Sequence, residues 1–322
     1  MNYRSRLSST LCFAGLAVQA CGALADKAGE SVAPDVYRPL MQGSHTLAAL
    51  APGGYSNSAE LGVAYTSDDN FKAGQYNGLQ EDGATLIGNL HWRQFSSDSY
   101  WRVSATDVGL DTREGQVTWG MADRLRIDLS FDSQLHVRND SGRTPFSGQS
   151  DLTLPAGWVG GLDTGQFSAL EGAFRGVERE LERETLSLAL DYRLNQDWRL
   201  DASVSHEERE GTTATGAAIY IDAASGDAAL LPAPVDYRTT EFDVGLAYSG
   251  DRLHLQGRLD YSDFDNRDEL LTWQNPYSSF GPGVAYPDGF GGLGLAPDNE
   301  QTRGRLTGQY IINATARIQF DG

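Results

Sequence analysis

Cysteine is almost missing from this chain of 322 residues, in which only Cys12 and Cys21 occur. Both lie within the first 25 residues, so the remainder can form neither a disulfide nor a thiolate metal site. The C-x-x-C-H sequence that attaches haem covalently is also missing. We therefore expect this chain to carry no cofactor and no metal site of its own.

Two further shortages narrow the class of protein. No long hydrophobic run follows residue 25, which excludes transmembrane helices from that part of the chain. Positive charge is scarce as well, because 25 basic residues face 44 acidic ones and the net charge is −19. A protein that binds phosphate backbones needs a basic face, so we exclude nucleic acid as a partner.

The N-terminus has the features of an export signal. Two arginines precede a mostly apolar stretch at residues 11–18, and Ala23-Leu24-Ala25 has the small-x-small form that signal peptidase cuts after Ala25. The alternative is a lipoprotein signal in which Cys21 is lipidated, but Gln19 fits that motif poorly. We expect an exported protein of the Gram-negative envelope.

What the chain does have is alternation of apolar and polar residues. An apolar residue at every second position predicts a β-strand with one apolar and one polar face. With the residues that flank them, most of the strands marked by these segments are expected to have the eight to eleven residues that a tilted strand needs to cross a bilayer. They are Ala59–Tyr65, Leu86–Trp92, Trp101–Ala105, Val117–Met121, Leu125–Phe131, Leu186–Tyr192, Trp198–Val204, Phe242–Tyr248, Leu253–Tyr261, Leu306–Tyr310 and Ala314–Phe320.

Aromatic residues favour a membrane barrel over a soluble β-sandwich, which would also have one polar face. They stand where apolar runs begin or end, as in the interfacial girdles of outer-membrane barrels. Backbone groups in hydrocarbon must all be paired, so such strands are viable only in a closed cylinder. The predicted lipid-interface aromatics are Tyr65, Trp92, Trp101, Trp119, Tyr192, Trp198, Tyr248 and Tyr261.

Connection lengths predict the topology. Short links at 94–98, 122–123, 195–197 and 249–251 alternate with long ones at 67–83, 106–113, 132–183, 206–237 and 263–301. Barrels inserted from the periplasm keep tight turns inside and long loops outside. We expect an all-β fold, an antiparallel up-and-down transmembrane β-barrel with long extracellular loops. With about 10–11 strands and an end in mid-pattern, it is expected to be an incomplete barrel.

The predicted organisation therefore has three parts. Residues 1–25 form the signal peptide, 26–54 a periplasmic N-terminal segment, and 55–322 the partial outer-membrane barrel.

Other candidate sites carry little weight. The histidines at 45, 91, 136, 206 and 254 lack metal-ligand spacing, and the acidic runs at 67–70 and 298–300 lack the pattern of a calcium loop. Ser205-His206-Glu207 contains the residue types of a hydrolase triad. Adjacent residues of a strand point to opposite faces, so these three cannot form one. We expect no enzyme.

Ordered segments from about residue 53 to the end resemble the MtrB/PioB family. This resemblance implies an outer-membrane barrel that ensheathes a periplasmic decahaem cytochrome, with the present chain similar to the N-terminal half. Some members carry a C-x-x-C near the mature N-terminus, which residues 26–54 lack. The similar segments are Glu60–Leu79, Gly88–Arg93, Gly109–Gly115, Asp140–Phe146, Leu231–Tyr237, Trp273–Tyr277 and Leu295–Glu300.

The function implied by the resemblance is a sheath for extracellular electron transfer. Haem belongs to the partner cytochrome inside the barrel, an extracellular multihaem cytochrome is a second candidate partner, and outer-membrane lipid surrounds the barrel. The alternative is a general diffusion porin or a substrate-specific channel. The implied lumen-facing cytochrome contacts, which could equally solvate the lumen or pair with inward acids, are Asn89, His91, Arg93, Arg102, Arg124, Arg126, His254 and Arg258.

Overall fold

The computed structural model describes residues 12–16, 57–161, 163–167, 170–220, 226–277 and 289–322. The predicted cleavage after Ala25 and the periplasmic segment 26–54 lie outside these residues.

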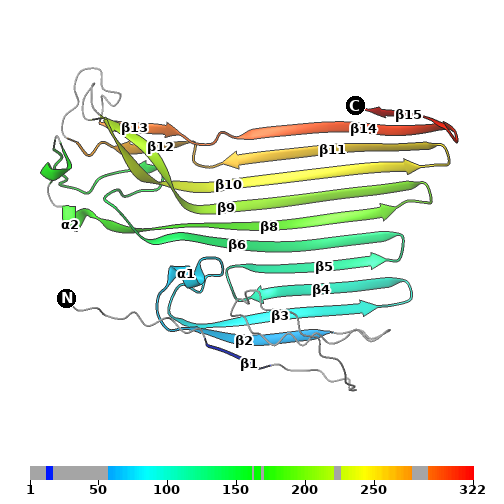
Figure 1. The fold of residues 1–322 in the computed structure, drawn as a ribbon, viewed down its shortest axis with the longest axis horizontal. Helices are drawn as coiled ribbons and strands as arrows, with labels where there is room; N and C mark the ends of the chain where they lie inside the picture. The colour runs from blue at the N-terminus through cyan, green and yellow to red at the C-terminus, as the bar shows by residue number, and fades with distance from the viewer. Residues whose placement is uncertain (1–11, 17–56, 162, 168–169, 221–225, 278–288) are drawn as a thin grey trace.

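One large antiparallel sheet makes up most of the structure (Figure 1). Each strand pairs with its neighbours in the sequence, in the order β1-β2-β3-β4-β5-β6-β8-β9-β10-β11-β14-β15. The bounds are β1 Cys12–Leu16, β2 Ser58–Thr66, β3 Gly83–Phe95, β4 Ser99–Val108, β5 Arg113–Met121, β6 Leu125–Thr144, β8 Arg175–Arg193, β9 Trp198–Tyr220, β10 Gly226–Ser249, β11 Leu253–Asn266, β14 Asn299–Asn313 and β15 Ala316–Asp321.

All eleven strands predicted from the alternation are present, as β2 to β6, β8 to β11, β14 and β15. The all-β, up-and-down architecture is therefore confirmed. The short turns lie at one end of the sheet and the long connections at the other (Figure 1). The sheet is open, because within the described residues its outermost strands β1 and β15 do not pair with each other.

Several strands are far longer than predicted, and the loops expected at 132–183 and 206–237 are partly wrong. β6, β9 and β10 have 20, 23 and 24 residues. The predicted alternation covers only the inner half of each of these strands, whereas backbone pairing continues well beyond it. Pro232 and Pro234 fit in β10 because only β9 pairs with that part, which leaves the other edge without a need for N–H donors.

A second, smaller sheet lies at the long-loop end, which the sequence did not predict. β12 (Leu270–Gln274) stands between β7 (Asp151–Leu152) and β13 (Phe290–Gly294). This distal unit has its own core, to which the β6–β8 and β11–β14 connections and the tips of β9 and β10 contribute. The buried members are Phe146, Leu152, Ala217, Ile219, Leu231, Ala233, Leu271, Trp273 and Tyr277.

The remaining short elements belong to the long connections. α1 (Phe71–Gly74) lies between β2 and β3, whereas η1 (Thr164–Gln166) and α2 (Leu170–Ala173) lie between β7 and β8. The connection with α1 packs Leu79 against Ala64 and Leu110. It then reaches β6, where the Val137 N–H donates to the Gln75 carbonyl at 2.9 Å.

Candidate functional site

The apolar face of the sheet is exposed over its whole width. Leu61 and Leu86 are 63% and 66% exposed, and Leu306 near the other edge is 53% exposed. A contiguous apolar surface of this size is not found on soluble monomers, whereas lipid covers it in a membrane barrel. The alternation that was read from the sequence therefore gives this sheet a face for hydrocarbon.

All eight predicted interface aromatics lie on this apolar face, as the strand registers show. Trp101 and Trp119 are neighbours with ring centroids 6.1 Å apart, and Trp198 and Tyr248 are 4.9 Å apart. Trp198 and Tyr248 flank short turns. Tyr65 ends β2 at the opposite end of the sheet. This arrangement matches two aromatic belts on either side of an apolar band.

The opposite face is polar and carries seven of the eight predicted lumen residues. Residues that pair across antiparallel strands share a face, so His91 lies with Ser104, and Arg93 with Arg102. Arg258 is opposite Gly245, and His254 is opposite Ser249. Arg124 is the exception, because it lies in the turn before β6 rather than within a strand.

Asn89 has a local partner instead of a free amide. Its Oδ1 accepts a 2.9 Å hydrogen bond from the Asp107 N–H. Asp107 has a φ of 55°, a left-handed conformation that needs support in a residue with a side chain. Asn89 therefore stabilises the irregular pairing of β3 and β4, which is a structural role that the sequence did not predict.

Several lumen-face arginines are paired with carboxylates within the sheet. Arg126 Nε lies 2.6 Å from Asp128 Oδ2, and Asp128 Oδ1 accepts from Thr118 Oγ1 at 2.6 Å. Arg199 forms an ion pair with Asp191 on the adjacent strand β8. These side chains are partly exposed, so each pair contributes only about 0–1 kcal/mol to stability.

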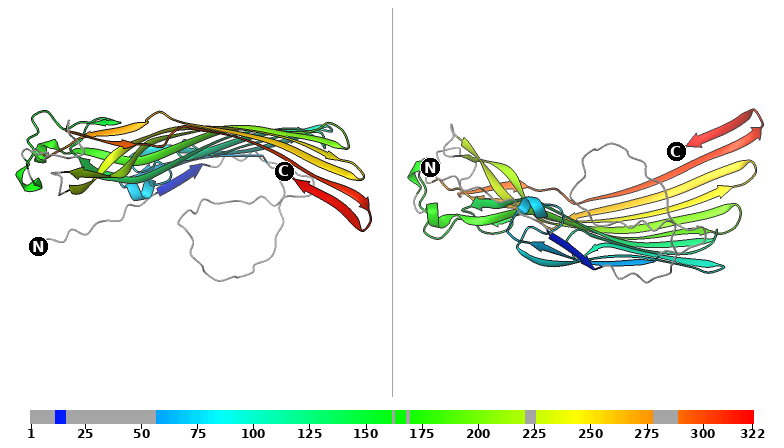
Figure 2. Two further views of the ribbon diagram at one scale, coloured as in Figure 1. Left: turned by 90° about the horizontal axis from the view of Figure 1, so that it is seen from above. Right: turned by 60° about the horizontal axis from the view of Figure 1, so that its bottom comes forward.

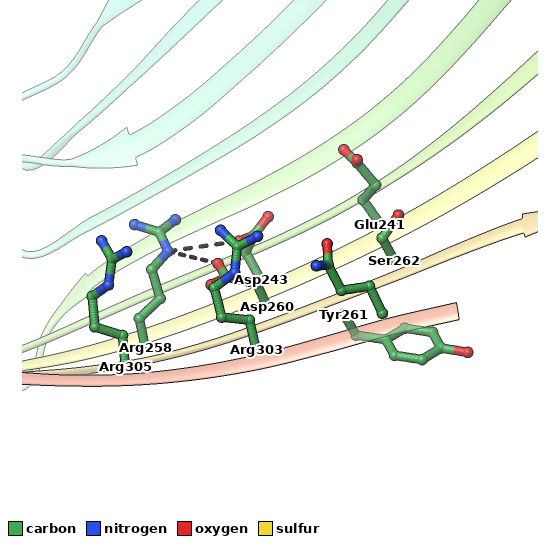
Figure 3. A pocket seen from close by; sticks show the side chains of 9 residues that line it. Glu241, Asp243, Arg258, Asp260, Tyr261, Ser262, Arg303 and Arg305 are labelled. Atoms are coloured by element: carbon green, nitrogen blue, oxygen red, sulfur yellow. Dashed lines mark hydrogen bonds and ion pairs between the residues drawn. The ribbon is translucent and has the colours of Figure 1, made fainter. Parts of the chain in front are cut away.

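Arg258 is the centre of a polar hollow of about 400 Å³ (Figure 3). Its Nε lies 3.1 Å from Asp260 Oδ1 and 3.6 Å from Asp243 Oδ1. The hollow is lined by side chains from β10, β11 and β14, namely Glu241, Asp243, Arg258, Asp260, Tyr261, Ser262, Gln301, Arg303 and Arg305.

The sequence prediction missed several lumen-face arginines, among them Arg199, Arg303 and Arg305. Arg199 follows the first predicted position of its strand, whereas Arg303 and Arg305 alternate with Thr302, Gly304 and Leu306. The signal in β14 is weak, because glycine and threonine take positions where apolar residues mark the lipid face elsewhere. The strand pairing, rather than the alternation, identifies this part of the polar face.

The outer half of β8 carries an acidic cluster beyond the apolar band. Burial raises the pKa of the Glu180 carboxyl, and the charges of Glu178 and Glu182 raise it further. Burial likewise raises the pKa of Glu182, with Glu184 as the next cause. Arg113 offsets part of this charge, since its Nη2 lies 3.1 Å from Glu184 Oε1.

The described residues offer little else for chemistry. Among them, no three His, Cys, Asp or Glu side chains are grouped so as to hold a metal ion. His136 stacks on Tyr76 with ring centroids 4.8 Å apart, and His206 contacts Thr240 and Glu208. His45 lies outside the described residues. No helix in the described ranges is long and apolar enough to cross a membrane.

Comparison with known proteins places the chain among outer-membrane proteins. Residues 65–320 match the model of the family described as outer membrane beta-barrel porin, MtrB/PioB. Over 263 residues the chain is 26% identical to "Outer membrane protein MtrB" of Shewanella baltica (strain OS185), covering 80% of this chain and 36% of that protein. The chain thus spans little more than a third of the length of this curated relative.

A solved structure with some likeness is OmpT, an outer membrane protein of Vibrio cholerae in its trimer form. The match covers 83% of this chain and 74% of that one, with 8% identity and a TM-score of 0.32. At this score the likeness supports no further argument.

Proposed function

Since the chain belongs to the MtrB/PioB family of outer-membrane β-barrel porins and resides in the Gram-negative outer membrane, we propose that it forms part of a sheath around a periplasmic multihaem c-type cytochrome. The sheath would let the cytochrome's haems carry electrons across the outer membrane. The family's decahaem cytochromes are the expected occupants.

The observation that carries this proposal is the combination of an exposed apolar face for lipid with an opposite face that is polar and charged. Arg126, Arg199 and Arg258 each have a carboxylate partner within the sheet. A lumen of this kind is hydrated or lies against a polar protein surface.

The width of the sheet also supports a protein occupant. Strands lie about 4.8 Å apart, so the eleven strands from β2 to β15 span about 50 Å. They do so without meeting, as Figures 1 and 2 show. Barrels of about eight strands are filled by their own side chains, and wider ones leave room for contents. A sheath therefore fits this sheet better than a narrow, self-filled barrel.

The composition of the chain supports the proposal that the redox groups belong to a partner. Its two cysteines form no C-x-x-C-H sequence, so covalent haem attachment has no site in it. A hydrocarbon core of about 30 Å separates the two aqueous sides, which is too far for an electron to cross without intermediate carriers. The cytochrome would supply these carriers, and the barrel would insulate them.

The test is co-purification followed by transport. An affinity tag inserted between Ala156 and Gly157, on the exposed connection before η1, allows the protein to be isolated from its own outer membranes. We expect a haem-staining protein to be recovered with it in mild detergent. Liposomes that contain this complex and enclose a redox dye should then reduce the dye when dithionite is added outside.

Two controls separate a sheath from a porin. Liposomes prepared without the complex should not reduce the dye. A diffusion porin would instead yield no haem protein and would let small sugars swell the liposomes. That pair of results would contradict the proposal.

A further inference from the structure

Arg303 and Arg305 are neighbours on the polar face of β14, two residues apart. In the register with β11, Arg303 is opposite Asp260 and Arg305 is opposite Arg258. Both line the hollow around Arg258 (Figure 3). Three guanidinium groups therefore lie on two adjacent strands.

The carboxylates of this hollow are already engaged or lie apart. Asp243 and Asp260 hold Arg258 at 3.6 and 3.1 Å. Glu241 lies two residues before Asp243 on β10, opposite Ser262. Figure 3 shows it on the far side of the hollow from Arg305. The hollow thus has an uneven charge, with its positive end on β14.

Within the described residues, neither Arg303 nor Arg305 forms an ion pair or a side-chain hydrogen bond. The charge of Arg303 acts on Asp260, but at a distance beyond that of an ion pair. Both arginines are exposed. Like charges on adjacent strands repel one another, and an anion between them removes this repulsion.

We propose that Arg303 and Arg305 form a carboxylate-binding pair, and that acidic groups on the protein in the lumen occupy it. The second half rests on the proposed function, whereas carboxylate binding does not. Guanidinium groups bind carboxylates through two parallel hydrogen bonds, which gives the pair both charge and directional recognition. Arg258, by contrast, is neutralised by Asp260 on its own strand and by Asp243 on β10, so it contributes little.

Citrate, a small tricarboxylate, is the probe for the site itself. The exported chain is titrated with citrate in detergent, and its β-structure is checked by circular dichroism. We expect Arg303→Gln/Arg305→Gln to raise the Kd about tenfold or more, because charge-assisted hydrogen bonds are lost. Arg317→Gln is the matched control, since Arg317 lies on β15 on the same polar face, opposite Ile311. It should leave the Kd unchanged.

Restoring the charge provides a second measurement. Residues 26–322 contain no cysteine, so Arg305→Cys has a single thiol in the exported chain. Aminoethyl methanethiosulfonate adds a cation there and should recover citrate binding. Methyl methanethiosulfonate adds a neutral group and should not. Equal binding after both reagents would show that charge at residue 305 is irrelevant.

The tagged complex tests the occupant. We expect the double glutamine variant to release its haem protein at lower salt than the wild type or Arg317→Gln. Citrate binding that is unchanged in the double variant would overturn the site. Citrate that fails to bind the wild type would also overturn it.

The two proposals can fail separately. Altered citrate binding with unchanged haem retention would overturn the assignment of the occupant and leave the sheath intact. Absence of any haem protein from the wild-type preparation would overturn the sheath proposal. The citrate measurement would still test carboxylate binding by the arginine pair.

Discussion

The indole ring of Trp273 on β12 covers Gly291, its register partner on β13. A Cβ built at Gly291 would lie 2.4 Å from Cε2 of that ring, closer than any real contact. Trp273 is only 3% exposed within the core of the distal unit, so it has little freedom to move away. The glycine is therefore a packing requirement of this small sheet.

Substitution of this glycine should loosen the distal unit. We expect Gly291→Ala to destabilise it by about 1–3 kcal/mol, as overpacked cores do. Gly292→Ala is the control, because its nearest neighbour would be Leu270 Cδ1 at an ordinary 3.7 Å. Limited proteolysis of the distal unit on intact cells measures the difference. Equal cleavage of both variants would contradict the packing argument.

The lipid face should reject charge while the lumen face accepts it. Leu259 lies in the middle of the apolar band on β11, and Gln256 on the same strand points to the polar face. We expect Leu259→Arg to cost about 2–4 kcal/mol of insertion free energy, and Gln256→Arg to cost far less. Heat-modifiable gel mobility reports the folded fraction. Similar losses for both would mean that the strand register is wrong.

The acidic cluster of β8 should make stability fall as pH rises. The folded-state pKa values of Glu180 and Glu182 are raised, so the folded protein binds more protons than the unfolded chain between the ordinary carboxyl pKa and the raised one. Unfolding free energy then decreases with increasing pH across that window. Glu180→Gln/Glu182→Gln should be more stable than the wild type at neutral pH and should lose this slope.

Urea unfolding at a series of pH values measures that effect. Asp265→Asn removes an exposed carboxylate elsewhere and serves as the control. A wild-type stability that rises with pH in this window would reverse the sign of the prediction.

The two ends of the sheet should lie on opposite sides of the membrane. Asp251 lies in a short turn and Ala156 in a long connection, both in the part of the chain that has no cysteine. A single cysteine at either position therefore places one thiol at one end of the sheet. We expect an impermeant maleimide to label Ala156→Cys on whole cells and Asp251→Cys only after the outer membrane is permeabilised. The reverse labelling pattern would invert the topology.

Alternation along the chain was sufficient to predict the eleven lipid-spanning strands and the face of residues such as Arg258, because side chains of a strand point to its two faces in turn. It could not predict contacts between distant connections. Gln75 meets His136 across 61 positions, and Trp273 meets a glycine that no periodic pattern marks. Nor could it show that Arg258 is paired while Arg303 is not, since pairing depends on side-chain geometry.

The alternating directions of the strands have a consequence for closure. β1 lies within the predicted signal peptide and runs against β2. Of the eleven described strands that follow residue 25, β2 and β15 are the outermost, and because the strands alternate in direction both of these edges run the same way. The parity of the sheet then forbids antiparallel joining of one edge to the other. A second copy in the same membrane orientation would likewise bring β2 alongside a parallel β15, whereas antiparallel neighbours at both edges need an odd number of strands between them.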